Sequence, residues 1–180
     1  MTGNDGAPDE SDGGPDITAS EDAGADPTAS RGKGPLLVAV DFSDDSRAAV
    51  AWAGAEADRL GKALTILHVV HDPASSPGFY RQIGEDWLRP MADVAGEMMD
   101  EFLAEMQAAH PGLHALAAAE ARQVTGLPAG RIVEVAKAVD APLVVVGSRG
   151  RTGLPHILLG SVAERVVQLA PMPVVVVKRP

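Results

Sequence analysis

The chain has 180 residues, a formal net charge of −10 and no cysteine, and 46% of its residues are apolar. Without cysteine it can form no disulfide, thiolate nucleophile or cysteine-ligated metal site. The acidic balance, with no cluster of Lys and Arg, argues against nucleic-acid and anionic-membrane partners. No apolar run reaches the roughly 20 residues that span a bilayer, and the N-terminus lacks the basic and apolar regions of a signal peptide, so we expect a cytoplasmic protein.

The first 34 residues differ in composition from the rest. They hold eight Asp or Glu residues against Arg31 and Lys33, and Ile17 is their only large aliphatic residue after Met1. A segment with so few apolar side chains cannot offset the entropy cost of ordering. We therefore expect a disordered acidic tail over residues 1–34 and one folded domain over residues 35–180. Deletion of residues 1–32 should leave ligand affinity nearly unchanged.

Short apolar runs alternate with helix-period segments along the folded part. Buried strands are predicted at residues 36–40, 64–70, 142–146 and 174–177, and residues 117–124 are expected to be a strand by position. The predicted helices run from Ser43 to Gly61, from a loop at residues 71–80 to about Ala109, from Pro128 to Val139, and from Gly160 to Leu169. Because each parallel crossover needs a helix-length connection, this alternation predicts a doubly wound α/β fold with helices on both faces of a parallel sheet.

The small residues around the last helix form the most informative motif. Gly147 and Gly150 follow an apolar strand, and Gly160 and Ser161 open the helix after a gap of nine residues. Glycines let backbone amides approach an anion where a Cβ would obstruct it, and the unpaired amides of a helix start attract phosphate. Asp41 ends the first strand, and if that strand neighbours the fourth, its carboxylate would face the glycines and could accept hydrogen bonds from adenine or ribose. The combination suits a nucleoside phosphate.

Other polar and sulfur-containing residues have simpler explanations. Asp41 alone could cap the helix that follows it, Asp44 and Asp45 suit the positive end of that helix, and Arg149 and Arg151 are expected to be solvated. The histidines show no metal-ligand spacing. The Met-rich stripe is expected to pack in the core; it comprises Met91, Met98, Met99, Phe102, Leu103 and Met106.

Three common enzyme and nucleotide motifs are missing from the sequence. The turn after the first strand has no glycine, so it lacks the dinucleotide fingerprint, and the chain has neither a P-loop nor a G-x-S-x-G elbow. These absences argue against Rossmann-type NAD binding, P-loop NTPase chemistry and α/β-hydrolase chemistry.

The pattern of Gly147, Gly150, Gly160 and Ser161 resembles the ATP-binding signature of the universal stress protein family. Further matches follow in the family's order at residues 40–43, 67–69, 125–128 and 158–164, so the resemblance covers about residues 35–179. It implies a Rossmann-like sheet of five parallel strands in the order 3-2-1-4-5. It also implies a homodimer in which Val174–Val177 of two subunits pair.

The resemblance further implies an ATP site. Ala39, Val40, Asp41 and Val69 should surround the adenine, Val146 and Gly147 should reach the ribose and α-phosphate, and Gly150, Gly160, Ser161 and Val162 should reach the phosphates. Any Mg²⁺ would be held mainly by the phosphates. The implied function is ATP-binding regulation in a stress response, with little or slow hydrolysis and an unknown protein partner. Two alternatives remain: a weak ATPase or nucleotidyl-transfer enzyme, and a nucleotide-independent interaction module that uses the Met-rich helix.

Overall fold

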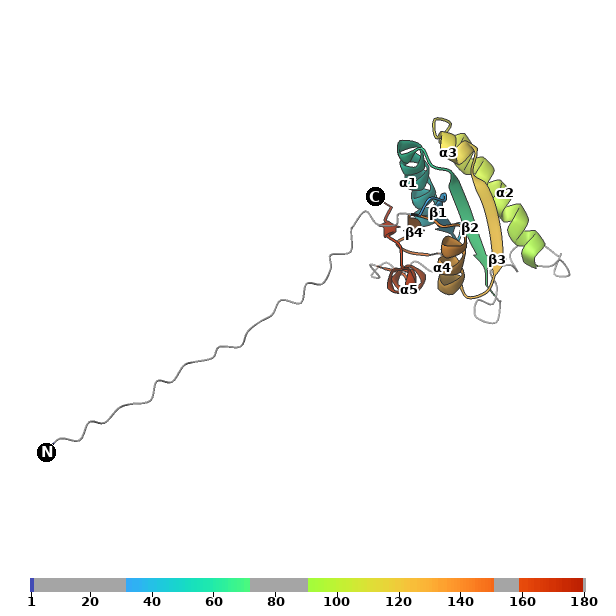
Figure 1. The fold of residues 1–180 in the computed structure, drawn as a ribbon. Coiled ribbons are helices and arrows are strands. Elements are labelled where there is room, and N and C mark those ends of the chain that lie inside the picture. Colours follow the sequence, from blue (N-terminus) through green and yellow to red (C-terminus); the bar gives the residue numbers. More distant parts are fainter. Residues whose placement is uncertain (2–31, 72–90, 151–158, 180) are drawn as a thin grey trace.

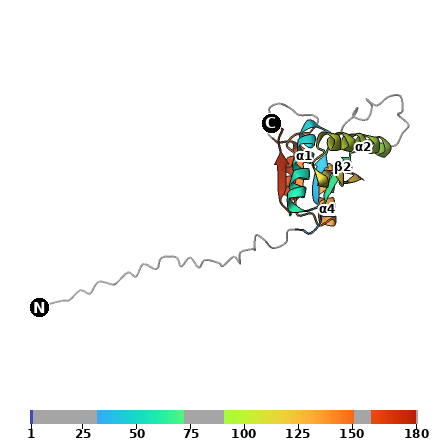
Figure 2. The same cartoon turned by 90° about the horizontal axis from the view of Figure 1, so that it is seen from above.

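Five parallel strands form one sheet in the order β3-β2-β1-β4-β5 (Figure 1). The computed structural model describes Met1 and residues 32–71, 91–150 and 159–179. The strands are β1 (Leu36–Val40), β2 (Leu64–Val70), β3 (Glu120–Thr125), β4 (Val144–Gly147) and β5 (Val174–Val177). The strand order is the predicted one, and β5 lies at one edge of the sheet, as the dark red arrow in Figure 2.

Helices connect these strands, and most of their ends follow from local sequence. They are α1 (Asp44–Leu60), α2 (Met91–Ala109), α3 (His114–Ala117), α4 (Pro128–Ala138) and α5 (Ser161–Leu169). As predicted, Ser43 caps α1, with its hydroxyl accepting the amide of Ser46 at 3.2 Å, and Gly61 ends it at a φ of 61°. The predicted acidic tail up to residue 31 and the loop from residue 72 to 80 lie outside the described residues.

Two apolar layers cover the sheet, one on each face. The layer under α1, α2 and α3 takes Leu36, Val38 and Val40 from β1, and Met99, Phe102 and Met106 of the Met-rich stripe are buried in it. The layer under α4 and α5 takes the alternate residues Leu37 and Ala39. The alternation follows the two-residue period of a strand that is buried on both faces. In the described residues, no helix is long and apolar enough to cross a membrane.

The region before β3 differs from the prediction. Residues 117–119 are not strand: α3 occupies His114–Ala117, and β3 begins at Glu120. The carboxylate of Asp58 in α1 accepts the amides of His114 at 2.9 Å and Ala115 at 2.7 Å, which satisfies two donors at the start of this short helix. The side chain of Leu116 is fully buried beside Gly54 of α1. Long-range contacts therefore convert an alanine-rich stretch into a helical turn.

The fourth strand is shifted by comparison with the prediction. It spans Val144–Gly147, whereas the apolar run suggested residues 142–146. Pro142 has no amide hydrogen for a sheet ladder. At the other end Gly147 still pairs with Val177, so the first glycine of the motif belongs to the strand itself.

Candidate functional site

Asp41 and the glycine-rich segment meet at the carboxyl edge of the sheet, because β1 and β4 are neighbours and Ala39 pairs with Val146. Gly150 lies directly beside the acid: a Cβ at position 150 would come within 2.6 Å of Asp41 Oδ2. Real Cβ atoms do not come so close to an oxygen, so any larger residue here would require the Asp41 carboxylate to shift. The predicted juxtaposition of carboxylate and glycines is therefore present.

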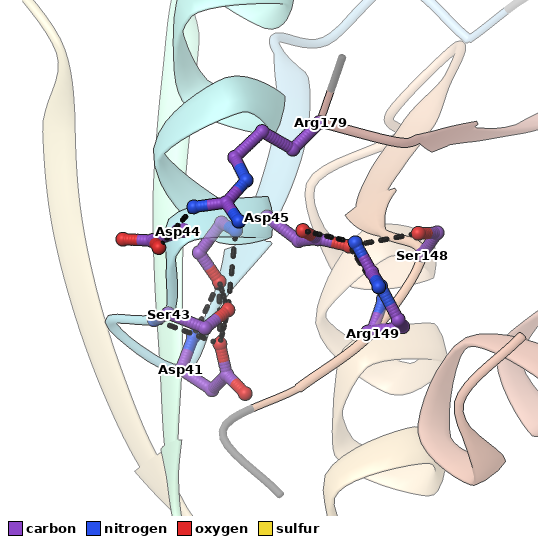
Figure 3. A network of polar contacts seen from close by, with 8 residues as sticks. Asp41, Ser43, Asp44, Asp45, Ser148, Arg149 and Arg179 are labelled. Atoms are coloured by element: carbon purple, nitrogen blue, oxygen red, sulfur yellow. Dashed lines mark hydrogen bonds and ion pairs between the residues drawn. The ribbon is translucent and has the colours of Figure 1, made fainter. Parts of the chain in front are cut away.

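Asp41 is fixed by the turn that leads into α1 (Figure 3). Its Oδ1 accepts three hydrogen bonds, from the amide of Ser43 at 3.1 Å and from the hydroxyls of Ser43 and Ser46 at 2.6 Å each. The hydroxyl of Ser46 in turn accepts the amide of Asp41 at 3.0 Å. Asp41 thus organises the turn into α1, whereas the N-cap of the helix is Ser43 and not Asp41.

Aromatic packing holds this turn in an unusual backbone conformation. Phe42 has a φ of 65°, which is uncommon for a bulky residue. Its ring lies 4.4 Å from the ring of His68 and 5.5 Å from that of Phe102, measured between centroids. His68 is buried in β2, and its Nδ1 donates to the carbonyl of Val40 at 2.8 Å, since a carbonyl can only accept. His68 therefore has a structural role at the end of β1.

The glycines of the motif lie against backbone. A Cβ at Gly147 would come within 2.9 Å of the carbonyl carbon of Asp45, and one at Gly160 would lie 3.4 Å from the carbonyl oxygen of Ser148. Gly160 is the N-cap of α5, and its amide donates to that same Ser148 oxygen at 2.7 Å. The end of β4 and the start of α5 are consequently held together.

The remaining predicted phosphate contacts stand at the start of α5. Ser161 is its first residue, Val162 follows, and both side chains are exposed, with Val162 at 41%. The amide of Glu164 donates to the carbonyl of Gly160 at 2.9 Å, so the amides that precede it make up the first, unpaired turn of the helix. Backbone amides and the Ser161 hydroxyl thus lie at one helix end, an arrangement that favours an anion.

The residues predicted around the adenine and the ribose divide between the two faces of the sheet. Ala39, Val69 and Val146 are buried and belong to the layer under α4 and α5, the same face as the start of α5. Val40 belongs to the opposite layer. Only the backbone of Val40 could therefore contribute to a site on the α4 and α5 face.

Asp45 forms a second polar cluster at this edge, which the sequence analysis did not anticipate (Figure 3). Its side chain is buried, and its Oδ2 accepts the Ser148 hydroxyl at 2.7 Å and the Arg149 amide at 3.0 Å. The Arg149 guanidinium, predicted to be solvated, lies against the same carboxylate, with Nε at 3.3 Å from Oδ2. Burial acts to raise the pKa of Asp45, but the hydrogen bonds from Ser148 and Arg149, with the charge of Arg149, lower it below its ordinary value.

The neighbouring acid has a different environment. Asp44 is exposed and forms ion pairs with Arg179, just beyond β5, and with Arg47 of its own helix. The two aspartates at the start of α1 therefore look alike in sequence but differ in burial and partners. Within the described part of the chain, no group of three or more His, Asp or Glu side chains could hold a metal ion.

The sequence model of the universal stress protein family matches residues 34–178. A universal stress protein of Mycolicibacterium smegmatis is 37% identical over 155 residues, which are 86% of this chain and 49% of the relative. The chain thus spans about half the length of the mycobacterial relatives that it matches.

Solved structures give the same fold with bound nucleotides. The universal stress protein from Archaeoglobus fulgidus in complex with dAMP has a TM-score of 0.54 and 27% identity, and the match covers 81% of this chain and 98% of that one. A universal stress protein in complex with cAMP has a TM-score of 0.55 and 28% identity, with 81% and 97% covered. Both of these neighbours hold an adenine nucleotide with a single phosphate.

Proposed function

The chain belongs to the universal stress protein family, and we propose that it is a regulatory protein that binds ATP at the carboxyl ends of β1 and β4. Bound nucleotide would be the regulatory state in a stress response, with little or slow hydrolysis. Ala39, Asp41, Val69 and the backbone of Val40 would surround the adenine. The phosphates would lie along Gly147, Gly150 and the start of α5, with Mg²⁺ held mainly by phosphate oxygens.

One observation carries this proposal: Gly150 and Gly160 leave space that a Cβ would fill, beside a fixed carboxylate and a helix start. Asp41 Oδ2 lies 2.6 Å from where the Cβ of residue 150 would be, and the Gly150 amide nitrogen lies 3.6 Å from where the Cβ of residue 160 would be. An acceptor for adenine or ribose and a set of backbone donors for phosphate are therefore present at one edge of the sheet. The dAMP and cAMP complexes of two relatives add support.

The environments of two acids near the glycines support the proposal of slow or absent hydrolysis. Asp45 is buried, and its lowered pKa makes it a poor general base. Asp41 Oδ1 is occupied by three donors from its own turn. Neither carboxylate resembles a base poised to activate water, and so binding is proposed rather than turnover.

The nucleotide-independent alternative depends on the Met-rich helix as a contact face. In the structure three residues of the stripe point inward: Met99, Phe102 and Met106 are 2 to 3% exposed and belong to the core layer under α1, α2 and α3. This burial argues against the stripe as a contact face. The Met-rich stripe was predicted to pack in the core, and for these three residues that prediction is confirmed.

The proposed function is tested by calorimetric titration of Mg-ATP into protein that has been unfolded, freed of copurifying nucleotide and refolded. We expect saturable binding, and we expect Gly160→Trp to lose it because the indole fills the space beside Ser148 and Gly150. GTP serves as the control for base selectivity. A flat titration of folded wild-type protein would contradict the proposal, and steady ADP release that Gly160→Trp abolishes would favour the weak ATPase.

We also propose a homodimer through β5. This strand has one strand neighbour in the described part of the chain, and Val174–Val177 are partly exposed. An apolar edge strand with unpaired backbone groups tends to pair with another chain. Pairing of two β5 strands would remove that edge.

A further inference from the structure

The carboxylate of Asp45 bridges two elements that are far apart in sequence. Asp45 belongs to the first turn of α1, and its partners Ser148 and Arg149, 103 and 104 residues away, follow β4. Oδ2 accepts both the Ser148 hydroxyl and the Arg149 amide, and Oδ1 lies 3.4 Å from Nη2 of Arg149. The Asp45 side chain is 6% exposed, so these donors replace water that burial has removed.

Ser148, the residue that Asp45 anchors, also connects two further elements, β5 and α5. Its amide donates to the carbonyl of Val177 at the end of β5, and its carbonyl accepts the amide of Gly160 at the start of α5, both at 2.7 Å. Fixing the side chain of Ser148 therefore fixes the backbone between the two halves of the glycine motif. A shift of Ser148 would move Gly150 away from Asp41 and Gly160 away from its hydrogen-bond acceptor.

The same contacts determine which hydrogen-bond donors near the glycines remain available to bind a phosphate. The amide of Arg149 is used by Asp45, and its guanidinium lies against the same carboxylate. The amide of Gly160 is used by Ser148. The donors that remain for an anion therefore include the first turn of α5 and the Ser161 hydroxyl, in a position that depends on Ser148.

On the basis of the proposed function, we infer that Asp45 is a positioning residue of the nucleotide site. It holds Ser148 and the Arg149 backbone so that Gly150 and the start of α5 are ordered before a nucleotide arrives. Because that order is established in the free protein, a bound nucleotide does not have to supply it, and affinity is higher. Arg149 acts in this arrangement as a partner of Asp45 and not as a phosphate ligand.

Asp44 provides a matched control. Asp44→Asn and Asp45→Asn remove the same charge from adjacent positions of one helix start, but only Asp45 contacts the segment after β4. In the calorimetric titration with Mg-ATP we expect Asp45→Asn to bind about tenfold more weakly, since hydrogen bonds to a charged group are lost. Asp44→Asn should stay within about twofold, because an exposed ion pair contributes little.

Ser148→Ala is the second variant, because it removes one donor and leaves Asp45 in place. We expect about threefold weaker binding. The double variant Asp45→Asn/Ser148→Ala should bind no more weakly than Asp45→Asn alone, because both changes remove one interaction. Equal losses for Asp44→Asn and Asp45→Asn, or fully additive losses in the double variant, would overturn the inference.

Amide hydrogen exchange of the nucleotide-free protein supplies a readout that does not need the ligand. We expect the Gly160 amide, which does not contact Asp45, to exchange about tenfold faster in Asp45→Asn than in Asp44→Asn, because its acceptor Ser148 is released. An unchanged Gly160 rate would overturn the positioning role. If wild-type protein binds no Mg-ATP, the proposed function fails, and the exchange rates still decide whether Asp45 orders the segment.

Discussion

Gly147 and Asp45 approach so closely that a Cβ on the glycine would lie 2.9 Å from the carbonyl carbon and 3.1 Å from the Cβ of the aspartate. Both of these atoms belong to Asp45, in the first turn of α1. That turn cannot move without disturbing Ser43 and the turn at Asp41. We therefore expect Gly147→Ala to lower the free energy of unfolding by about 1–3 kcal/mol, through overpacking. Urea denaturation of the variant and wild type measures this difference.

Gly130 is the matched control for that substitution. It lies in the first turn of α4, and a Cβ there would meet nothing within 4 Å. Because alanine favours a helix more than glycine does, Gly130→Ala should be neutral or stabilise by up to about 1 kcal/mol. Equal effects of the two substitutions would show that the close approach at Gly147 does not matter for stability.

Acid should weaken the fold partly through Asp45. Its pKa is lowered in the folded state relative to its ordinary value of about 3.9, so the unfolded chain binds the proton more tightly. The resulting stability is present above about pH 4 and is lost as the pH falls through the lower, folded pKa. The stability difference between wild type and Asp45→Asn should accordingly shrink as the pH is lowered from 6 to about 3.

Urea midpoints across that pH range check this expectation. Glu56, whose pKa the hydrogen bond from Arg59 lowers, titrates in the same direction in both proteins, so Asp45→Asn should retain some dependence on pH. A difference between wild type and Asp45→Asn that stays constant down to pH 3 would show that the carboxylate charge does not contribute.

Patterns that extend over only a few residues were enough to predict most of the helices and strands. The apolar runs of β1, β2 and β5, the cap at Ser43 and the left-handed Gly61 all act within a few residues, so the sequence alone indicates them. The strand order followed from the family resemblance and is confirmed. By contrast, α3 depends on Asp58, which is 56 residues from His114, and no local pattern reveals that contact.

The site shows the same division between local and long-range information. The glycines were recognisable because their spacing is a sequence property, whereas Asp44 and Asp45 are chemically identical neighbours. Only the packing of α1 against β4 buries one of them and leaves the other exposed. A sequence pattern could have distinguished the two acids, because Asp45 continues the buried stripe of Ala49 and Val50 along α1.

The proposed dimer predicts a substitution that acts on the free edge of β5. The carbonyls of Pro173 and Val177 accept hydrogen bonds from β4 and the residue after it, so by the two-residue period the amides of Val174 and Val176 point to the free edge. Val176→Pro would remove one such donor without removing a bond to β4. We expect sedimentation equilibrium to give a dimer for wild type and a monomer for Val176→Pro, and equal masses would count against pairing through β5.

Hydrogen bonds of Lys33 and Gly34 anchor the backbone just before β1. This anchor lies at the end of the sheet opposite to the glycines. The amides of Lys33 and Gly34 donate to the side chain and backbone of Asp140 at 2.8 and 2.9 Å, and the Lys62 ammonium lies 3.3 Å from the carbonyl of Lys33. A Cβ at Gly34 would come within 1.8 Å of the carbonyl oxygen of Val139, so the backbone packs tightly here.

Two deletions separate this anchor from the acidic segment before it. Removal of residues 1–31 keeps the anchor and should leave both Mg-ATP affinity and the melting temperature nearly unchanged. Removal of residues 1–34 also deletes the hydrogen bonds to Asp140 and should lower the melting temperature by a few degrees, since about 1 kcal/mol shifts it by roughly 2–8 °C in domains of this size range. Affinity should still hold, because the anchor and the nucleotide site lie at opposite ends of the strands. Weaker binding in the shorter deletion would mean that residues before Gly32 belong to the folded, ligand-binding unit.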